Sequence, residues 1–67
     1  MTDIDKLAED ARLKKEVFLR LRSEKAVYDT LKRAAGEYSD AIEAWHKARF
    51  PHKKFRRPSV GYLLRAL

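Results

Sequence analysis

Apolar residues in the first half of the chain recur at steps of three, four and seven positions, the spacing of one face of an α-helix. The series is Ile4, Leu7, Ala11, Phe18, Leu21, Tyr28, Leu31 and Ala35. Thr2, followed by Asp3 and Asp5, is typical of a helix start, because a hydroxyl caps free backbone N–H groups and acids favour that end of the helix dipole. The pattern predicts one long amphipathic helix from residue 2 or 3 to about residue 35.

Glycine and proline, which break helices, occur at only four positions, and the first of these is Gly36. Gly36 followed by Ser39 resembles a helix end and a fresh N-cap, so we expect a tight turn at 36–38 and a second helix from about residue 39 to Phe50. The alternative is a helix that continues through Gly36 and pairs as a coiled coil, because apolar residues keep a 4-3-4-3 spacing across it. These residues are Leu31, Ala35, Tyr38, Ile42 and Trp45.

The C-terminal part of the chain combines two prolines with a cluster of bases. Pro51 should end the second helix by forcing Phe50 out of helical geometry. An extended basic loop to Pro58 follows, and Ser59 can cap a short helix that runs to Leu67. We therefore expect an all-α helical hairpin over residues 1–50, with a basic loop and a short helix over 51–67, all within a single domain.

The chain has 67 residues and no cysteine, so its core is small and no disulfide reinforces it. A core of this size rarely supplies more than about 3–5 kcal/mol. Two antiparallel helices without a third layer also leave apolar flanks partly exposed. A two-fold four-helix arrangement would cover those flanks, so we expect a homodimer. The expected interface residues are Phe18, Leu21, Tyr28, Leu31 and Ile42.

Residue types that carry catalysis are absent or explained otherwise. There is no cysteine and no glycine-rich phosphate loop, and the serines sit where helix caps or turns account for them. Glu43 and His46 have the Glu-x-x-His spacing of di-iron bundles. The simpler interpretation is that Glu43 pairs with Lys47 while His46 lies on the polar face of its helix. We therefore expect no enzyme activity, no cofactor and no metal site.

The charge of the chain is uneven. The formal net charge is +6, yet no acid follows Glu43, whereas seven bases do. Between His46 and Arg57 these bases alternate with aromatic residues, a mixture that suits either nucleic-acid phosphates or protein-binding hot spots. The chain contains no asparagine or glutamine, the side chains that recognise adenine through two hydrogen bonds, which weakens the case for sequence-specific DNA recognition.

These features favour a small regulatory protein that binds an acidic surface of another protein and inhibits or redirects it, in the manner of compact phage or plasmid regulators. The expected contact residues are Trp45, Arg49, Phe50, Phe55, Arg56 and Arg57. The alternative is a nucleic-acid-binding protein of the nucleoid or transcription-regulator type. Its phosphate contacts would be Lys47, Arg49, Lys53, Lys54, Arg56 and Arg57. The simplest interpretation of Phe50 and Phe55 is that both rings pack back onto the hairpin.

Membrane binding is not expected. The bases lie in a loop bounded by prolines rather than on a broad amphipathic helix, and no uncharged run of 18 residues occurs. The lack of cysteine fits a reducing compartment. We expect a cytoplasmic protein.

Overall fold

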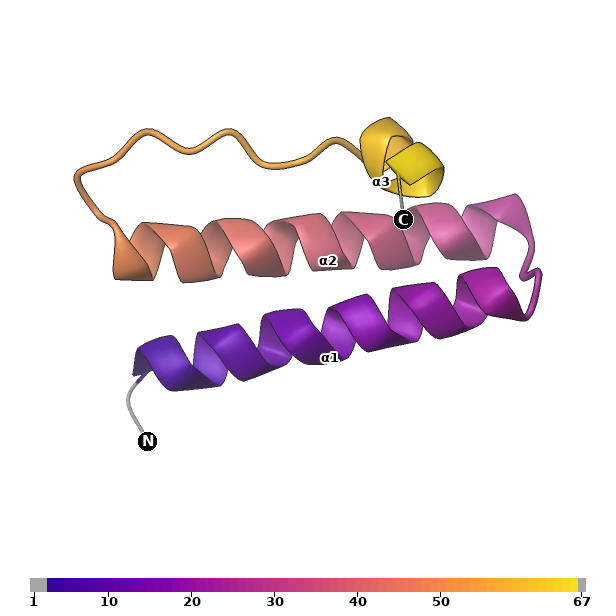
Figure 1. Ribbon diagram of the computed structural model, residues 1–67, viewed down its shortest axis with the longest axis horizontal. Coiled ribbons are helices and arrows are strands. Elements are labelled where there is room, and N and C mark those ends of the chain that lie inside the picture. The colour runs from indigo at the N-terminus through magenta and orange to yellow at the C-terminus, as the bar shows by residue number, and fades with distance from the viewer. Residues whose placement is uncertain (1–2, 67) are drawn as a thin grey trace.

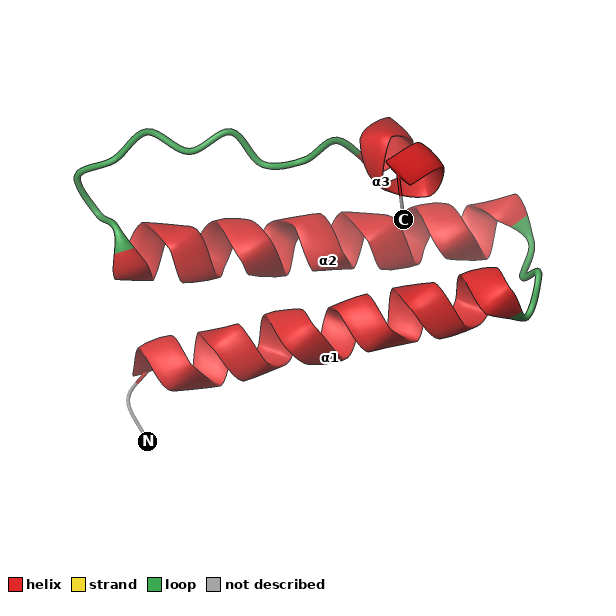
Figure 2. Ribbon diagram, in the orientation of Figure 1, coloured by secondary structure: helices red, strands yellow, loops and turns green. Residues whose placement is uncertain are grey.

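The computed structural model describes residues 3–66, and within that range every regular element is helical (Figure 1, Figure 2). Helix α1 spans Asp3–Ser23, α2 spans Tyr28–Arg49 and α3 spans Val60–Ala66. The two long helices lie antiparallel, and α3 packs on α2. Between α2 and α3 the chain runs back along α2 as an extended segment, here called the basic loop (residues 50–59). The predicted all-α class is confirmed.

The turn of the hairpin lies at residues 24–27, so the predicted turn at 36–38 is wrong. Helix α1 ends in a Schellman motif, in which Ala26 N–H donates to the Leu21 carbonyl at 3.0 Å and Lys25 N–H donates to the Arg22 carbonyl at 3.1 Å. This motif needs a left-handed residue, and Lys25 supplies it with φ of 57°. The position usually holds glycine, which explains why the sequence carried no recognisable stop signal there.

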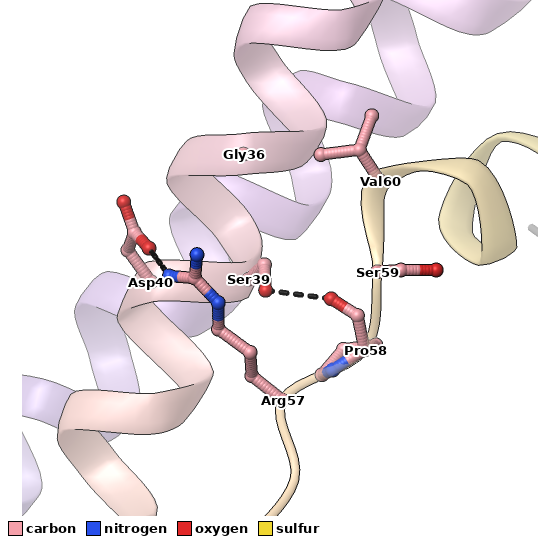
Figure 3. A pocket seen from close by; sticks show the side chains of 7 residues that line it. All are labelled: Gly36, Ser39, Asp40, Arg57, Pro58, Ser59 and Val60. Carbon is pink, nitrogen blue, oxygen red and sulfur yellow. Dashed lines mark hydrogen bonds and ion pairs between the residues drawn. The ribbon is translucent and has the colours of Figure 1, made fainter.

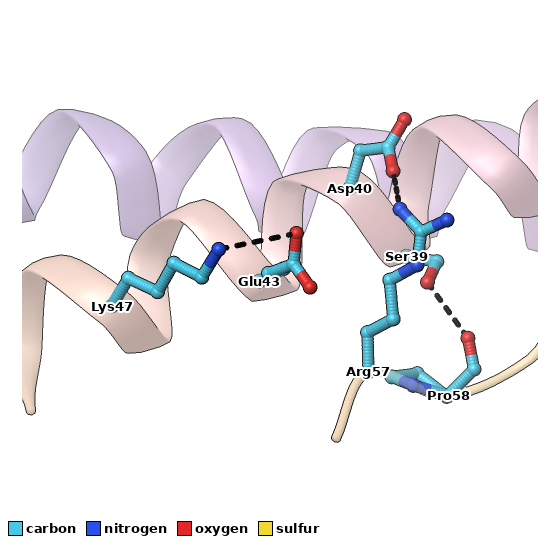
Figure 4. Close-up of polar contacts among 6 residues, drawn as sticks. All are labelled: Ser39, Asp40, Glu43, Lys47, Arg57 and Pro58. Carbon is cyan, nitrogen blue, oxygen red and sulfur yellow. Dashed lines mark hydrogen bonds and ion pairs between the residues drawn. The ribbon is translucent and has the colours of Figure 1, made fainter. Parts of the chain in front are cut away.

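Gly36 lies inside α2, so the uninterrupted helix considered above is correct at this position. Ser39, which had suggested a new N-cap, instead holds the basic loop together with Asp40. The Ser39 hydroxyl is buried and donates to the Pro58 carbonyl at 2.7 Å, and Asp40 forms an ion pair with Arg57 (Figure 4). Gly36, Ser39 and Asp40 share a face because residues three and four apart are neighbours on a helix. That face receives the loop.

The hydrophobic core is small and uses all three helices. Phe18 from α1, Ala34 and Ala35 from α2, and Leu63 from α3 are buried together. Partly buried side chains surround them, namely Leu21, Leu31, Tyr38, Val60 and Leu64. We had expected no third layer over the hairpin, and α3 provides one, with Leu63 only 3% exposed.

Two other predicted boundaries are confirmed. Helix α2 ends at Arg49, with Phe50 outside helical geometry (φ −131°, ψ 68°) directly before Pro51. Ser59 caps α3, because its Oγ accepts a hydrogen bond from Tyr62 N–H at 3.1 Å. The predicted cap at Thr2 and the predicted helix end at Leu67 lie outside the described residues.

Candidate functional site

Four rings gather where α2 ends and the basic loop begins, and we call them the aromatic cluster (Trp45, His46, Phe50 and Phe55). His46 is at its centre: its ring stacks on Phe55 with centroids 4.2 Å apart and planes at 16°, and lies 5.0 Å from Phe50. Trp45 meets Phe50 edge to face at 6.2 Å, the geometry that aromatic quadrupoles favour. Contacts between helix and loop therefore fix the start of the loop.

His46 was expected on the polar face of its helix, and this interpretation is wrong. The residue is half-buried, and its Nδ1 atom is buried with no hydrogen-bond partner among residues 3–66. The imidazole therefore acts in packing, because its ring contacts bring Phe50 and Phe55 against α2. Both phenylalanines do pack back onto the hairpin, as the simplest interpretation had it, and both keep part of their surface exposed. The sequence signal that could have revealed His46 is its position four residues before Phe50 on one helix face.

Exposed bases border the aromatic cluster. The Arg49 guanidinium carbon and Lys53 Nζ each lie 5.2 Å from the centre of the Phe50 ring, within the range of cation–π attraction. Lys54 and Arg56 follow along the loop, and all four side chains are exposed. Within residues 3–66 none of the four has a carboxylate partner. Their positive charge is therefore available to an external anion.

Two other bases of the C-terminal third, one in α2 and one in the basic loop, form ion pairs within the chain. Lys47 pairs with Glu43 at 3.7 Å, as predicted, and Arg57 pairs with Asp40 (Figure 4). Arg57 was expected to contact a partner or a phosphate, which stays a prediction; within the chain its guanidinium pairs with Asp40 of α2. Of the predicted contact residues, the structure brings Trp45, Phe50 and Phe55 into one cluster with Arg49 beside it. Arg56 lies further along the loop.

The residues predicted to form a dimer interface differ in exposure. Phe18 is fully buried in the core of the single chain, whereas Tyr28 is 63% exposed. Leu21, Leu31 and Ile42 are half-buried. Sequence reasoning overlooked Leu13 and Val17, which lie one turn apart on α1 and are 46% and 37% exposed.

Two hollows flank the end of the basic loop. The first, of about 370 Å³, lies between the loop and α2 and is lined by Gly36, Ser39, Asp40, Arg57, Pro58, Ser59 and Val60 (Figure 3). The second, of about 480 Å³, lies where the loop enters α3. Its lining residues are Arg56, Arg57, Pro58, Ser59 and Tyr62. Ser59 and Tyr62 had no place in the predicted site.

Among the described residues, no group of three or more His, Cys, Asp or Glu side chains is arranged to hold a metal ion. None of the described helices is both long and apolar enough to cross a membrane. Comparison with protein-family models, with curated proteins and with solved structures found no match to this chain.

Proposed function

We propose that this chain is a non-catalytic regulatory protein that docks onto an acidic surface of another protein and thereby inhibits or redirects it. One observation carries the proposal: half-buried aromatic rings at the end of α2 are bordered by exposed bases that no carboxylate of the described chain neutralises.

This arrangement has the anatomy of a protein-binding hot spot. Such sites centre on aromatic and arginine side chains that lose their water on binding, and polar groups at the rim exclude solvent around them. Trp45, Phe50 and Phe55 would supply the apolar centre. Arg49 and Arg56 would supply charged groups, because a guanidinium can grip a carboxylate through two parallel hydrogen bonds.

The test compares two neighbouring loop residues that differ in burial, Phe55 and Lys54. Tagged wild type, Phe55→Ala and Lys54→Ala would each be used to capture proteins from a lysate of the source organism, followed by quantitative mass spectrometry. The affinity of a captured protein would then be measured with both partners purified. We expect Phe55→Ala to weaken binding at least tenfold, whereas Lys54→Ala mainly slows association.

Phe55 also packs on His46, so its loss could disturb the loop. Phe55→Leu keeps an apolar side chain at this position and should retain most of the affinity if packing alone is needed. Circular dichroism of all variants checks that the helices persist. Equal weakening by Phe55→Ala and Lys54→Ala would contradict a hot spot centred on the rings.

Nucleic acid is the alternative anionic partner, and the number of exposed bases sets the expected salt dependence of its affinity. Four unpaired bases on four phosphates would give a log–log dependence of affinity on salt with a slope of about −3.6, at about −0.9 for each phosphate. Fluorescence anisotropy with random-sequence duplex DNA, between about 50 and 200 mM salt, measures this slope. Micromolar affinity with such a slope would replace the protein-binding proposal. In that case each lost lysine should reduce the slope by about one.

We also propose that the protein acts as a homodimer. The exposed apolar pair Leu13 and Val17, one turn apart on α1, supports a contact between two chains, because burying these side chains is favourable; Tyr28 of the predicted interface is exposed as well. Sedimentation equilibrium should give twice the chain mass for wild type and the chain mass for Leu13→Glu. Lys15→Glu, which changes a fully polar position of the same helix, is the control and should leave the dimer intact. A wild type that stays monomeric at 100 µM, roughly the dissociation constant of a weak dimer, would contradict this proposal.

A further inference from the structure

The second hollow is concave and its polar groups all come from one short stretch of chain. It has a volume of about 480 Å³ and is lined by residues 56–59 together with Tyr62. No acidic residue is among them. The segment is held in place by α2 on its other side, through the ion pair of Arg57 with Asp40 and the hydrogen bond from Ser39 to Pro58. The backbone that carries the hollow is therefore anchored to α2, while the hollow itself is open to solvent.

The groups around this hollow are hydrogen-bond donors. Arg56 is exposed and has no carboxylate partner in the described chain. Ser59 points away from Ser39 and Asp40 (Figure 3), and its Oγ already accepts from Tyr62 N–H, so its hydroxyl proton is available to donate outward. Tyr62 is 57% exposed and carries a second hydroxyl donor. All three residues line the hollow, so their donors suit a ligand that only accepts hydrogen bonds.

We propose that this hollow is a subsite for one carboxylate side chain, an Asp or Glu of the acidic partner. An ionised carboxylate has two oxygens and only accepts hydrogen bonds. Its oxygens can accept two parallel hydrogen bonds from the Arg56 guanidinium and further bonds from the Ser59 and Tyr62 hydroxyls. The inference rests on the proposed function and names the group on the partner that this part of the loop recognises.

Charge complementarity favours a carboxylate over a phosphate group. Arg57 is neutralised by Asp40, which leaves Arg56 as the uncompensated positive charge among the residues that line the hollow. One guanidinium balances the single charge of a carboxylate. A phosphate monoester carries about −1.5 to −2 at neutral pH and would retain an unbalanced charge at this place.

The test uses the intact protein and a defined probe, an acetylated and amidated tripeptide of three glutamates, with the matching glutamine tripeptide as control. Titration is followed by ¹H–¹⁵N NMR, including the Arg Nε–Hε signals. We expect the glutamate peptide to cause saturable shifts at Arg56, Ser59 and Tyr62, and the glutamine peptide to cause none.

Variants separate this subsite from the general positive charge of the loop. Arg56→Gln should weaken binding of the glutamate peptide about tenfold, because a charge-assisted pair of hydrogen bonds is lost. Tyr62→Phe, which removes only a hydroxyl, should weaken it about threefold. Lys54→Gln removes one charge of the same loop outside the hollow and should change the affinity less than about twofold.

Three results would overturn the inference: no saturable shift at residues 56–62, equal weakening by Arg56→Gln and Lys54→Gln, or tighter binding of inorganic phosphate than of the glutamate peptide. These outcomes are distinct from failure of the proposed function. The peptide titration does not depend on the aromatic cluster, whereas the capture experiment depends on Phe55. If the peptide does not bind but a partner protein is still captured, only the subsite proposal is refuted and the proposed function stands.

Discussion

Replacing Gly36 with alanine should stabilise the protein, and the sign of this change tests the position of the turn. Gly36 lies in the interior of α2, and its φ is not positive. A Cβ at this position would meet Val60 Cγ2 at 4.0 Å, an ordinary van der Waals contact. Alanine is favoured over glycine inside a helix by about 0.8–1.0 kcal/mol, chiefly because the unfolded chain loses conformational freedom. No steric term opposes this gain.

For a domain of this size, 1 kcal/mol corresponds to a shift in Tm of about 4–8 °C. Thermal unfolding followed by circular dichroism at 222 nm should therefore show Gly36→Ala melting about 4–8 °C above wild type. Gly61→Ala is the matched control: a Cβ there meets nothing within 4 Å, and the position lies near the start of the seven-residue α3. It should give a smaller gain, because terminal turns contribute less to the unfolding transition.

A Tm for Gly36→Ala equal to or below that of wild type would refute this reasoning. A glycine in a left-handed turn at 36–38 would give that result, since alanine in this conformation costs about 1–2 kcal/mol. Melting at two protein concentrations separates the effect from any change in self-association, because the Tm of a dimer depends on concentration.

Three further changes test the rest of the fold. Lys25→Gly should raise the free energy of unfolding by about 1 kcal/mol in urea titrations, because it relieves a left-handed lysine; no gain would argue against the Schellman motif. Phe18→Ala should leave the chain largely unfolded by circular dichroism, since losing a fully buried ring costs about 3–5 kcal/mol, whereas Phe18→Leu should still fold cooperatively. Ser39→Ala should speed amide exchange at Leu63, whose N–H donates to the Ser59 carbonyl at 3.0 Å, but not in α1, because it removes a hydrogen bond of about 1 kcal/mol that holds the loop; unchanged exchange at Leu63 would show that other contacts suffice.

The sequence allowed prediction of the elements that local chemistry determines. Pro51 ends α2, and Ser59 caps α3, because each acts through backbone groups within a few residues of itself. The turn at 24–27 escaped prediction because lysine occupies a position that normally carries glycine. The residues around Lys25 give no indication of a left-handed conformation. The helical spacing of apolar residues in α1 also continues across the turn into α2.

Gly36 lies inside α2, and nothing in the described structure requires glycine there. The signal at Ser39 was real but had another cause. Ser39 holds a loop about 20 residues further along the chain, and the sequence pattern gives no indication of such tertiary contacts. The same holds for the candidate site. Composition located the basic and aromatic segment, yet it could not show that His46 joins the phenylalanines or that Arg57 is neutralised by Asp40. Those pairings depend on the path of the loop along α2.

That path has a consequence for how the protein can bind. The basic loop is attached to α2 at both ends, through the stacking of Phe55 on His46 and through the contacts of Arg57 and Pro58 with α2. A free segment rich in lysine and arginine would lose backbone and side-chain freedom on meeting its target, at about 1–2 kcal/mol for each ordered residue. Here folding has already ordered the backbone that presents Lys53, Lys54 and Arg56. The loop is thus preorganised, and more of its contact energy can appear as affinity.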